Sequence, residues 1–354
     1  MRILITGICG FVGSTLAHAW AESGSGHELF GIDNFVRPGS EINRQRLRRL
    51  GVTVRHGDIR SASDFETLPE VDWLIDAAAN PSVLAGIDGR TSSRQLVEHN
   101  LFGTVNMLEF CRQRRAGFIL LSTSRVYSIA ELSRLQVEAP GDAFRLSGGQ
   151  QVDGVSTEGV SEAFSTEPPV SLYGATKRAS EQLALEYGAA FDFPVRINRC
   201  GVLAGAGQFG RADQGIFSYW IHAWASGRPL TYIGFEGTGH QVRDCLHPRD
   251  LADLLERQMQ STSREHTRVL NVSGGARSAM SLKELSAWCT DRFGSRNVRQ
   301  DLSPRAYDVP WLVLDSRLAM TEWSWSPRAD SDGILEEIAV HAEANPSWFD
   351  LTYD

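Results

Sequence analysis

Short apolar runs rich in β-branched residues alternate with longer segments of helical period along most of the chain. Such alternation is typical of βαβ units, in which helices cover both faces of a parallel sheet. We therefore predict an α/β protein built on a doubly wound parallel sheet. Its strands are expected at residues 2–6, 28–33, 53–56, 73–77, 118–122, 195–199 and 269–272.

Segments of helical period separate these strands. Apolar residues at Val97, Leu101, Val105, Leu108 and Cys111 recur at three- and four-residue steps, which places them on one face of a helix. Further helices are expected at residues 11–21 and 171–187.

Two stretches depart from the alternation. Residues 128–170 are rich in Gly, Ser, Glu and Gln and contain the breakers Gly148-Gly149 and Pro168-Pro169, which predicts a long irregular excursion between a strand and a helix. Beyond about residue 200 the alternation becomes irregular. We assign residues 1–198 and 242–273 to the domain built on the sheet. Residues 199–241 and 274–354 are assigned to a smaller, mainly C-terminal lobe that would hold the substrate.

Composition narrows the class of protein. The 354 residues carry 35 Lys and Arg against 43 Asp and Glu, so the net charge of −8 offers no basic excess for phosphates, and we expect no nucleic-acid partner. Five scattered cysteines form no metal-ligand spacing, which favours reduced thiols and no metal site. The first apolar run follows Met1-Arg2 directly, and no apolar stretch has the length of a membrane span. A cytoplasmic protein without a membrane partner is expected.

A glycine triplet follows the first predicted strand. Gly7, Gly10 and Gly13 open the helical segment that begins near Phe11 and Val12, in a strand-turn-helix context. The first glycine permits a tight turn, the second lets backbone approach a pyrophosphate, and the third allows close packing of helix on strand. The helix N-terminus then holds the phosphates. This arrangement predicts a Rossmann-type dinucleotide site.

An acidic residue at the end of the second strand refines the cofactor. Asp33 lies 20 residues after Gly13, where a carboxylate accepts hydrogen bonds from an adenosine ribose, and Asn34 stands beside it. The same carboxylate repels a 2′-phosphate, so NAD is favoured over NADP, although Arg37 nearby is able to accommodate such a phosphate. Asp58 and Ile59 follow the third strand and are placed next to the adenine.

Candidate catalytic residues gather at a later strand end. Tyr173 and Lys177 lie four residues apart on a predicted helix and therefore share one face. The strand ending at Ser122, Thr123 and Ser124 carries hydroxyls to the carboxyl edge of the sheet, where ligands of open α/β folds bind. A tyrosine must lose its proton more easily than usual to act as a base, and a nearby ammonium has that effect.

In this order, the motifs resemble those of the extended short-chain dehydrogenases/reductases over essentially the whole chain. The resemblance implies that Tyr173 is the catalytic acid/base, that Lys177 holds the nicotinamide ribose, and that Thr123 bonds the reacting sugar oxygen. It also implies a supporting role for Asn100, in the run that ends at Gly103-Thr104. We add Ala77, Ala78, Ala79 and Ser122 to the cofactor contacts.

Later motifs point to a nucleotide-diphosphate sugar as the substrate. The run that contains Arg243 and the later Arg305 and Asp308 resembles segments that, in sugar-nucleotide enzymes of this family, contact the diphosphate and a ribose hydroxyl. Two guanidiniums on one diphosphate suit planar, bidentate recognition. Further substrate contacts are assigned to Ser124, Gln208 and Gln214.

Within the family, the chain is most similar to the CDP-paratose (CDP-tyvelose) 2-epimerase branch. The resemblance rests on Gly7–Phe11, 207–209, 213–215, 239–244 and 271–275. It implies inversion of one ring carbon through a keto-sugar, in an enzyme of carbohydrate and lipopolysaccharide biosynthesis. Four positions depart from the usual pattern, namely Asp76, Asn80, Ser128 and Val202.

Other activities share most of these motifs. A UDP-sugar 4-epimerase or an NAD(P)-dependent nucleotide-sugar reductase would retain all of them. A dehydratase needs an acid and a base after Thr123, but Ser124 and Arg125 stand there, and arginine offers no acceptor. A non-catalytic dinucleotide-binding regulator would have no use for both Tyr173 and Lys177.

The resemblance also bears on assembly. Residues 93–114 and 171–190 carry apolar positions on more than one face. In the family such helices pair across a two-fold axis as a four-helix bundle. A homodimer or homotetramer is therefore expected.

Overall fold

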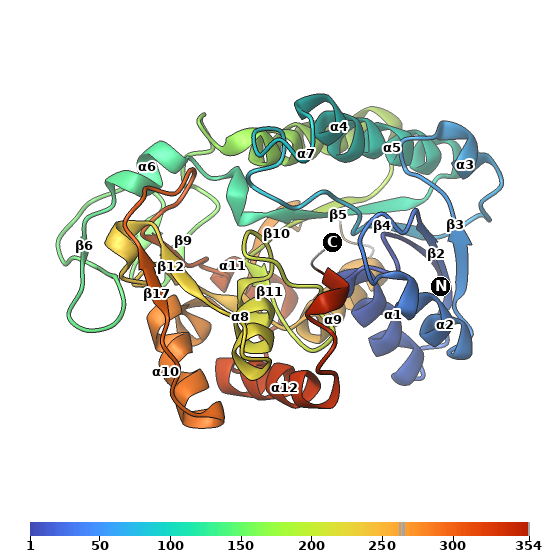
Figure 1. Ribbon diagram of the computed structural model, residues 1–354. Coiled ribbons are helices and arrows are strands. Elements are labelled where there is room, and N and C mark those ends of the chain that lie inside the picture. The colour runs from blue at the N-terminus through green and yellow to red at the C-terminus, as the bar shows by residue number, and fades with distance from the viewer. Residues whose placement is uncertain (262, 264–265, 353–354) are drawn as a thin grey trace.

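A seven-stranded parallel sheet forms the centre of the molecule. The computed structural model describes residues 1–261, 263 and 266–352. Strand order is β15-β10-β5-β4-β1-β2-β3, which confirms the predicted doubly wound sheet (Figure 1). The strands are β1 (Arg2–Thr6), β2 (Glu28–Asp33), β3 (Thr53–His56), β4 (Trp73–Asp76), β5 (Gly117–Thr123), β10 (Val195–Cys200) and β15 (Val269–Val272).

Helices cover both faces of this sheet (Figure 1). One layer contains α3 (Ala62–Glu66), α4 (Ser93–Val97), α5 (Gly103–Arg114) and α7 (Ser171–Phe191). The other contains α1 (Phe11–Glu22), α2 (Glu41–Arg49), α9 (Pro248–Gln260) and α11 (Arg317–Trp323). The helix predicted through Val97 to Cys111 is interrupted by a π-helical turn, η1 (Glu98–Phe102), which joins α4 to α5.

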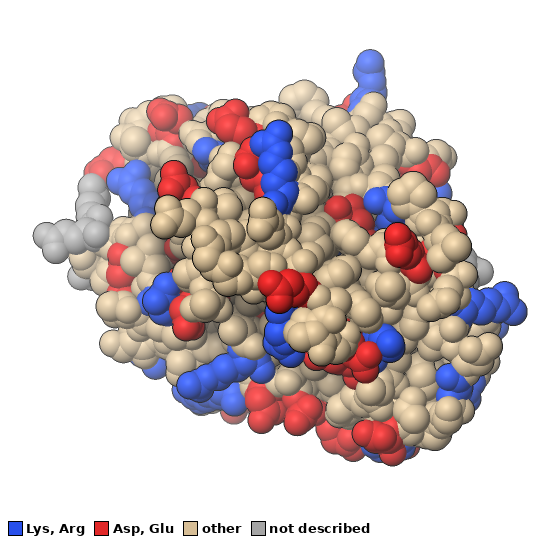
Figure 2. All heavy atoms as spheres, turned by 90° about the vertical axis from the view of Figure 1, so that its left-hand side faces the viewer, with Lys and Arg blue, Asp and Glu red and all other residues tan. Residues whose placement is uncertain are grey.

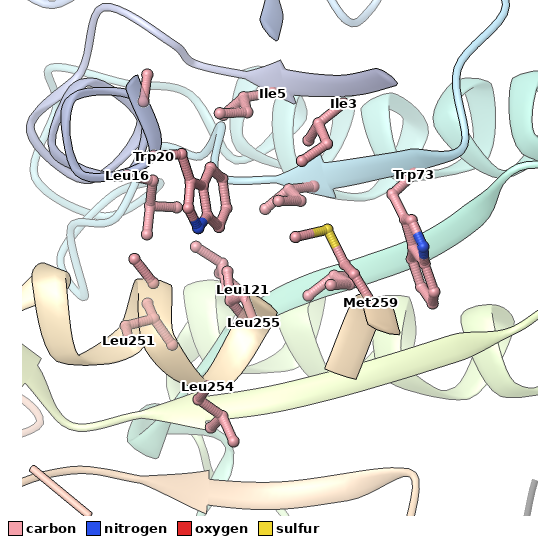
Figure 3. Packing of buried hydrophobic residues seen from close by; sticks show 14 of the residues in the cluster. Ile3, Ile5, Leu16, Trp20, Trp73, Leu121, Leu251, Leu254, Leu255 and Met259 are labelled. Carbon is pink, nitrogen blue, oxygen red and sulfur yellow. The ribbon is translucent and has the colours of Figure 1, made fainter. Parts of the chain in front are cut away.

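The core between α1, α9 and the sheet is built from large apolar side chains. Trp20 of α1 lies against Ile5 of β1, with Leu251 and Leu255 of α9 facing it (Figure 3). All are buried, and each fully buried side chain of this size stabilises the fold by about 1.5–3 kcal/mol. The parallel strands are thus held so that their carboxyl ends meet at one edge.

The reversal of strand order lies between β1 and β4. From β1 the chain moves outward through β2 and β3, whereas β4, β5 and β10 extend to the other side. Ligands of open α/β sheets bind outside the carboxyl ends of the strands at such a reversal. Thr6, Asp33, Asp76 and Thr123 are the last residues of their strands and lie there.

A smaller lobe follows β10. Its helices are α8 (Ile216–Ala225), α10 (Leu282–Phe293) and α12 (Ser331–Ala344). Its strands form three small sheets, β11 (Val202–Leu203) with β14 (Cys245–Leu246), β12 (Thr231–Ile233) with β17 (Arg299–Asp301), and β16 (Met280–Ser281) with β13 (Val242–Arg243) and β18 (Trp311–Leu312). Single helical turns lie at Phe235–Gly237, Gly275–Ser278 and Asp350–Thr352.

The excursion at 128–170 contains more regular structure than the sequence predicts. It comprises α6 (Ile129–Arg134) and two hairpins, β6 (Val137–Glu138) with β7 (Arg145–Leu146) and β8 (Val155–Ser156) with β9 (Gly159–Val160). Val160 bridges Leu314, and the Phe144 N–H donates to the His240 carbonyl at 2.8 Å. The excursion therefore packs on residues that we assigned to the smaller lobe, and the exact domain limits stay a prediction.

Charges of both signs are interspersed on the face that carries this excursion (Figure 2). Lys283 pairs with Asp142 at 3.0 Å and Arg134 with Glu131 at 2.7 Å. No helix in the described part of the chain combines the length and apolarity that a membrane span requires. Within the same residues no group of three or more His, Cys, Asp or Glu is arranged to hold a metal ion, and all five cysteines are buried.

Candidate active site

A cavity of about 1300 Å³ opens at the carboxyl edge of the sheet and reaches into the smaller lobe. Every residue that the sequence predicted for the site lines this cavity, except Asp58 and Asn100. Residues far apart in the chain, from the glycine turn to Asp308, thus share one space.

The glycine turn forms a close cradle at the start of α1. Gly7 adopts φ +62°, and a Cβ there would lie 2.9 Å from the Ala78 Cα atom. A Cβ at Gly13 would lie 2.5 Å from the Gly7 carbonyl oxygen. Only glycine fits both places, so the N-terminus of α1 opens directly onto the cavity. This is the geometry that a pyrophosphate requires.

Asp33 ties the glycine turn to the end of β2. Its carboxylate accepts the Cys9 N–H at 2.9 Å and the Phe35 N–H at 2.8 Å. Burial raises the pKa of Asp33, and these backbone donors act against that rise. Oxygen lone pairs are left for ribose hydroxyls, because a carboxylate offers about four. The Arg37 guanidinium would favour NADP if it bound a 2′-phosphate. In the structure it donates to the Phe209 carbonyl.

Asp58 lies outside the cavity and acts through its neighbour. It pairs with Arg60 at 2.7 Å and accepts from the Asn34 amide at 3.0 Å. Burial raises the pKa of Asp58, but these hydrogen bonds outweigh burial and lower it overall. Asp58 thus holds the Asn34 side chain, and Ile59 lines the cavity itself, while a contact of Asp58 with the adenine stays a prediction.

Asn100 lies behind the cavity wall, within the π-helical turn. Its side chain accepts the Asn80 N–H at 2.9 Å, and its amide donates to the Asn80 carbonyl at 3.1 Å and to the Thr176 hydroxyl at 3.2 Å. These bonds tie the loop after β4 to α7. The placement agrees with a supporting role, and π-helical turns are frequent at functional sites.

The predicted catalytic trio meets where β5 ends and α7 begins. Thr123 is the last residue of β5, and its side chain hydrogen-bonds the phenol of Tyr173. Tyr173 and Lys177 lie one helical turn apart and are both buried. Ser122, by contrast, donates its hydroxyl to Glu181 at 2.6 Å, as part of a buried network with Arg199.

The electrostatics of Tyr173 differ from the expectation. Burial raises the pKa of Tyr173 to about 12, while the Thr123 hydrogen bond and the Arg125 charge oppose this. We expected the Lys177 ammonium to dominate. Its Nζ atom instead lies 3.9 Å from Asp76 Oδ2, so its charge is shared with a buried carboxylate. The sequence does not indicate this pair, because the two residues belong to distant elements.

Guanidiniums gather at the other end of the cavity. Arg243 bonds Asp308 at 3.1 Å, and Arg305 donates to the Ala212 carbonyl at 3.0 Å. Arg125 also lies here and approaches the Tyr307 carbonyl at 3.4 Å. Burial, followed by the neighbouring Arg243, lowers the pKa of Arg125 to about 10. The cluster suits a diphosphate, and Arg125 is a member that we considered only as evidence against a dehydratase.

Two of the remaining predicted contacts, Gln208 and Gln214, lie in the loop after β11. Gln208 lines the cavity, but its amide donates to the Leu203 carbonyl at 2.8 Å. Gln214 pairs with Arg211 through the backbone. The loop is also held across the cavity, since Ser82 donates to Asp213 at 2.5 Å. Ser124 is buried at the cavity wall.

This geometry places the chain among the extended short-chain dehydrogenases/reductases, in which a cofactor lies across the carboxyl edge of the sheet and Tyr and Lys face it. Comparison with family models identifies one family within this class. The chain belongs to the NAD dependent epimerase/dehydratase family, whose model matches residues 3–273. It is an enzyme, and NAD is its cofactor, as the glycine cradle and Asp33 predicted.

Individual relatives extend the match beyond the family model. CDP-paratose 2-epimerase from Salmonella typhi is 28% identical over 94% of this chain and 97% of its own length. UDP-glucuronate 4-epimerase 3 from Arabidopsis thaliana is 29% identical over 71% of this chain and 55% of its own. The structure of UDP-glucuronic acid 4-epimerase from Bacillus cereus superposes with a TM-score of 0.78 at 24% identity, covering 97% and 99% of the two chains, which confirms the fold.

Proposed function

We propose that this enzyme inverts one ring carbon of a nucleotide-diphosphate sugar, in the manner of a CDP-paratose 2-epimerase. The observation that carries the proposal is the single cavity that holds Thr123, Tyr173 and Lys177 at one end and Arg243 and Arg305 at the other. A sugar at the first end and its diphosphate at the second satisfy both groups. The near full-length similarity to CDP-paratose 2-epimerase supports the choice within the family.

Different residues would bind different parts of NAD. Gly7, Gly10 and Gly13 would cradle the pyrophosphate of NAD, and Asp33 its adenosine ribose. NAD, when bound, would supply a hydride acceptor that later becomes the hydride donor, and a positive charge that favours the phenolate. Lys177 would hold the nicotinamide ribose.

Tyr173 and Thr123 handle the proton of the reacting hydroxyl. Thr123 orients that hydroxyl toward the Tyr173 oxygen, which removes its proton as the carbon beneath is oxidised. The keto-sugar rotates in the cavity and presents its other face, while its diphosphate stays bound to the arginines. Tyr173 then returns the proton as reduction from the opposite face inverts the centre. General acid/base assistance of this kind is typically worth about 10²–10⁴ in rate.

The strand end after Thr123 argues against elimination of water. Ser124 is buried, and the Arg125 guanidinium is directed at the Tyr307 carbonyl, so neither supplies a carboxyl acid or base. A UDP-sugar 4-epimerase is the second candidate, because five of the similar relatives are UDP-glucuronate 4-epimerases or a probable one.

A substrate panel tests the proposal. The purified protein is incubated with CDP-, UDP-, GDP- and dTDP-sugars, and epimers are resolved by chromatography and NMR. We expect turnover of a CDP-sugar, and Tyr173→Phe is expected to lose at least about 10² in turnover while binding NAD and the sugar as before. Arg134→Met, in an exposed ion pair with Glu131 on α6 and outside the cavity lining, serves as the control. Turnover of UDP-sugars alone would favour the second candidate, and release of a dehydrated product would refute both.

A further inference from the structure

Asp76 is a buried carboxylate beside the candidate catalytic residues. It ends β4 and is 1% exposed. Its Oδ1 atom accepts from the Thr6 hydroxyl of β1 at 3.2 Å, and Thr6 in turn accepts the Ala78 N–H at 3.3 Å. Its Oδ2 atom has no hydrogen-bond partner among the described residues and lies 3.9 Å from Lys177 Nζ. Burial raises the pKa of Asp76, and the Lys177 charge acts most strongly against that rise, so the carboxylate is ionised only because Lys177 compensates its charge.

Charges of opposite sign surround the Tyr173 phenol. Arg125 comes from η2 (Ser124–Val126) and favours the phenolate. Lys177 lies one turn along α7, and an ammonium near a phenol acts in the same direction. Asp76 from β4 acts in the other direction. The Cys200 thiol of β10 also lies near the phenol, but burial raises its pKa to about 12, so it is uncharged at neutral pH. The neutral Thr123 hydroxyl of β5 completes the surroundings with its hydrogen bond.

We propose that the ionised carboxylate of Asp76 is a positioning residue, which holds the Lys177 ammonium and offsets part of its charge so that Tyr173 both accepts and returns a proton. This inference rests on the proposed function. An epimerase needs its tyrosine as a base in the first half of the cycle and as an acid in the second. General acid/base catalysis is most effective when the pKa of the group lies near the working pH. Lys177, Arg125 and the positively charged ring of NAD all stabilise the phenolate, and Asp76 balances them.

The ionisation of Tyr173 is measurable without a substrate. The ultraviolet absorbance of tyrosinate is titrated in the enzyme–NAD complex, and the contribution of Tyr173 is obtained by subtracting the same titration of Tyr173→Phe. In Asp76→Asn, measured against its own Tyr173→Phe double variant, the midpoint of Tyr173 is expected to fall by about one pH unit or more. Removal of a negative charge favours the phenolate, which sets the direction. Asp76→Glu keeps the charge and should restore most of the original midpoint.

Two further variants complete the test. Asp315→Asn removes a carboxylate that pairs with Arg317 away from the cavity, and it should leave the midpoint unchanged. If Asp76→Asn does not fold, Asp76→Ser removes the same charge and should lower the midpoint in the same direction.

The outcomes separate this inference from the proposed function. An unchanged Tyr173 midpoint in Asp76→Asn, with NAD still bound, would overturn the role of Asp76. A lowered midpoint in a protein that turns over no nucleotide sugar would leave the role of Asp76 standing and overturn the proposed function.

Discussion

The carboxylate of Asp33 serves the fold and the cofactor together. It accepts two backbone N–H groups, from Cys9 and Phe35, and it faces the cavity. Asp33→Ser should raise the affinity for NADP relative to NAD, because a negative charge that opposes the 2′-phosphate is removed. Isothermal titration with both cofactors measures the ratio. Asp253→Ser, on α9 and outside the cavity lining, is the matched control. The assignment is wrong if the unaltered enzyme already binds NADP about tenfold, or 1.4 kcal/mol, more tightly than NAD.

Single residues also show where sequence reasoning ends. The glycines, Asp33, Tyr173 and Lys177 were predictable because each belongs to a short motif whose spacing has a physical reason. The pairing of Asp76 with Lys177 depends on how β4 lies against α7, and no local pattern encodes it. Asp58 was predicted next to the adenine; its carboxylate bonds Asn34 and Arg60, and its contact with the cofactor stays a prediction.

At the scale of elements, the position of α7 against the end of β5 determines whether the Tyr173 phenol lies next to the Thr123 side chain. Gly174 permits this contact, because a Cβ there would lie 2.2 Å from the Arg125 carbonyl oxygen. Gly174→Ala should therefore displace the start of α7 and lower turnover. It should also reduce the free energy of unfolding by about 1–3 kcal/mol, the usual cost of overpacking.

Thermal or denaturant unfolding and steady-state rates measure the two effects. Gly141→Ala is the matched control, since nothing lies within 4 Å of the Cβ that it adds. Equal turnover and an equal free energy of unfolding in Gly174→Ala and Gly141→Ala would contradict the prediction.

The regular elements followed from periodicity, but their docking did not. All seven strands of the sheet lie where the alternation predicted them, within one residue at each end. The two hairpins between residues 128 and 170 were not predicted. Their strands are only two residues long, and they pack on residues distant in the sequence, such as Leu314. The π-helical turn, in which Asn100 bonds the backbone of Asn80, was not predicted either.

On the scale of the whole molecule, the layer formed by α4, α5 and α7 exposes large apolar side chains. Phe102, Leu172 and Phe191 are 56%, 38% and 49% exposed. We propose that this layer pairs with its copy in a homodimer. Phe102→Lys should weaken the dimer, because burial of a charge in an apolar interface is costly.

Light scattering at micromolar concentration measures the mass of both forms. Val340→Lys is the control, since Val340 is 54% exposed but belongs to α12 on another side of the molecule (Figure 1). A strictly monomeric unaltered protein would contradict the proposal.

The central claim is a redox-neutral cycle in which one hydride leaves a ring carbon and returns to the opposite face of that same carbon. Turnover of a CDP-sugar deuterated at C2 tests it most directly. The account predicts that the epimerised product retains the deuterium at C2, that no label exchanges into solvent, and that no free NADH accumulates. Loss of the label to water, or one NADH released for each product formed, would contradict the account.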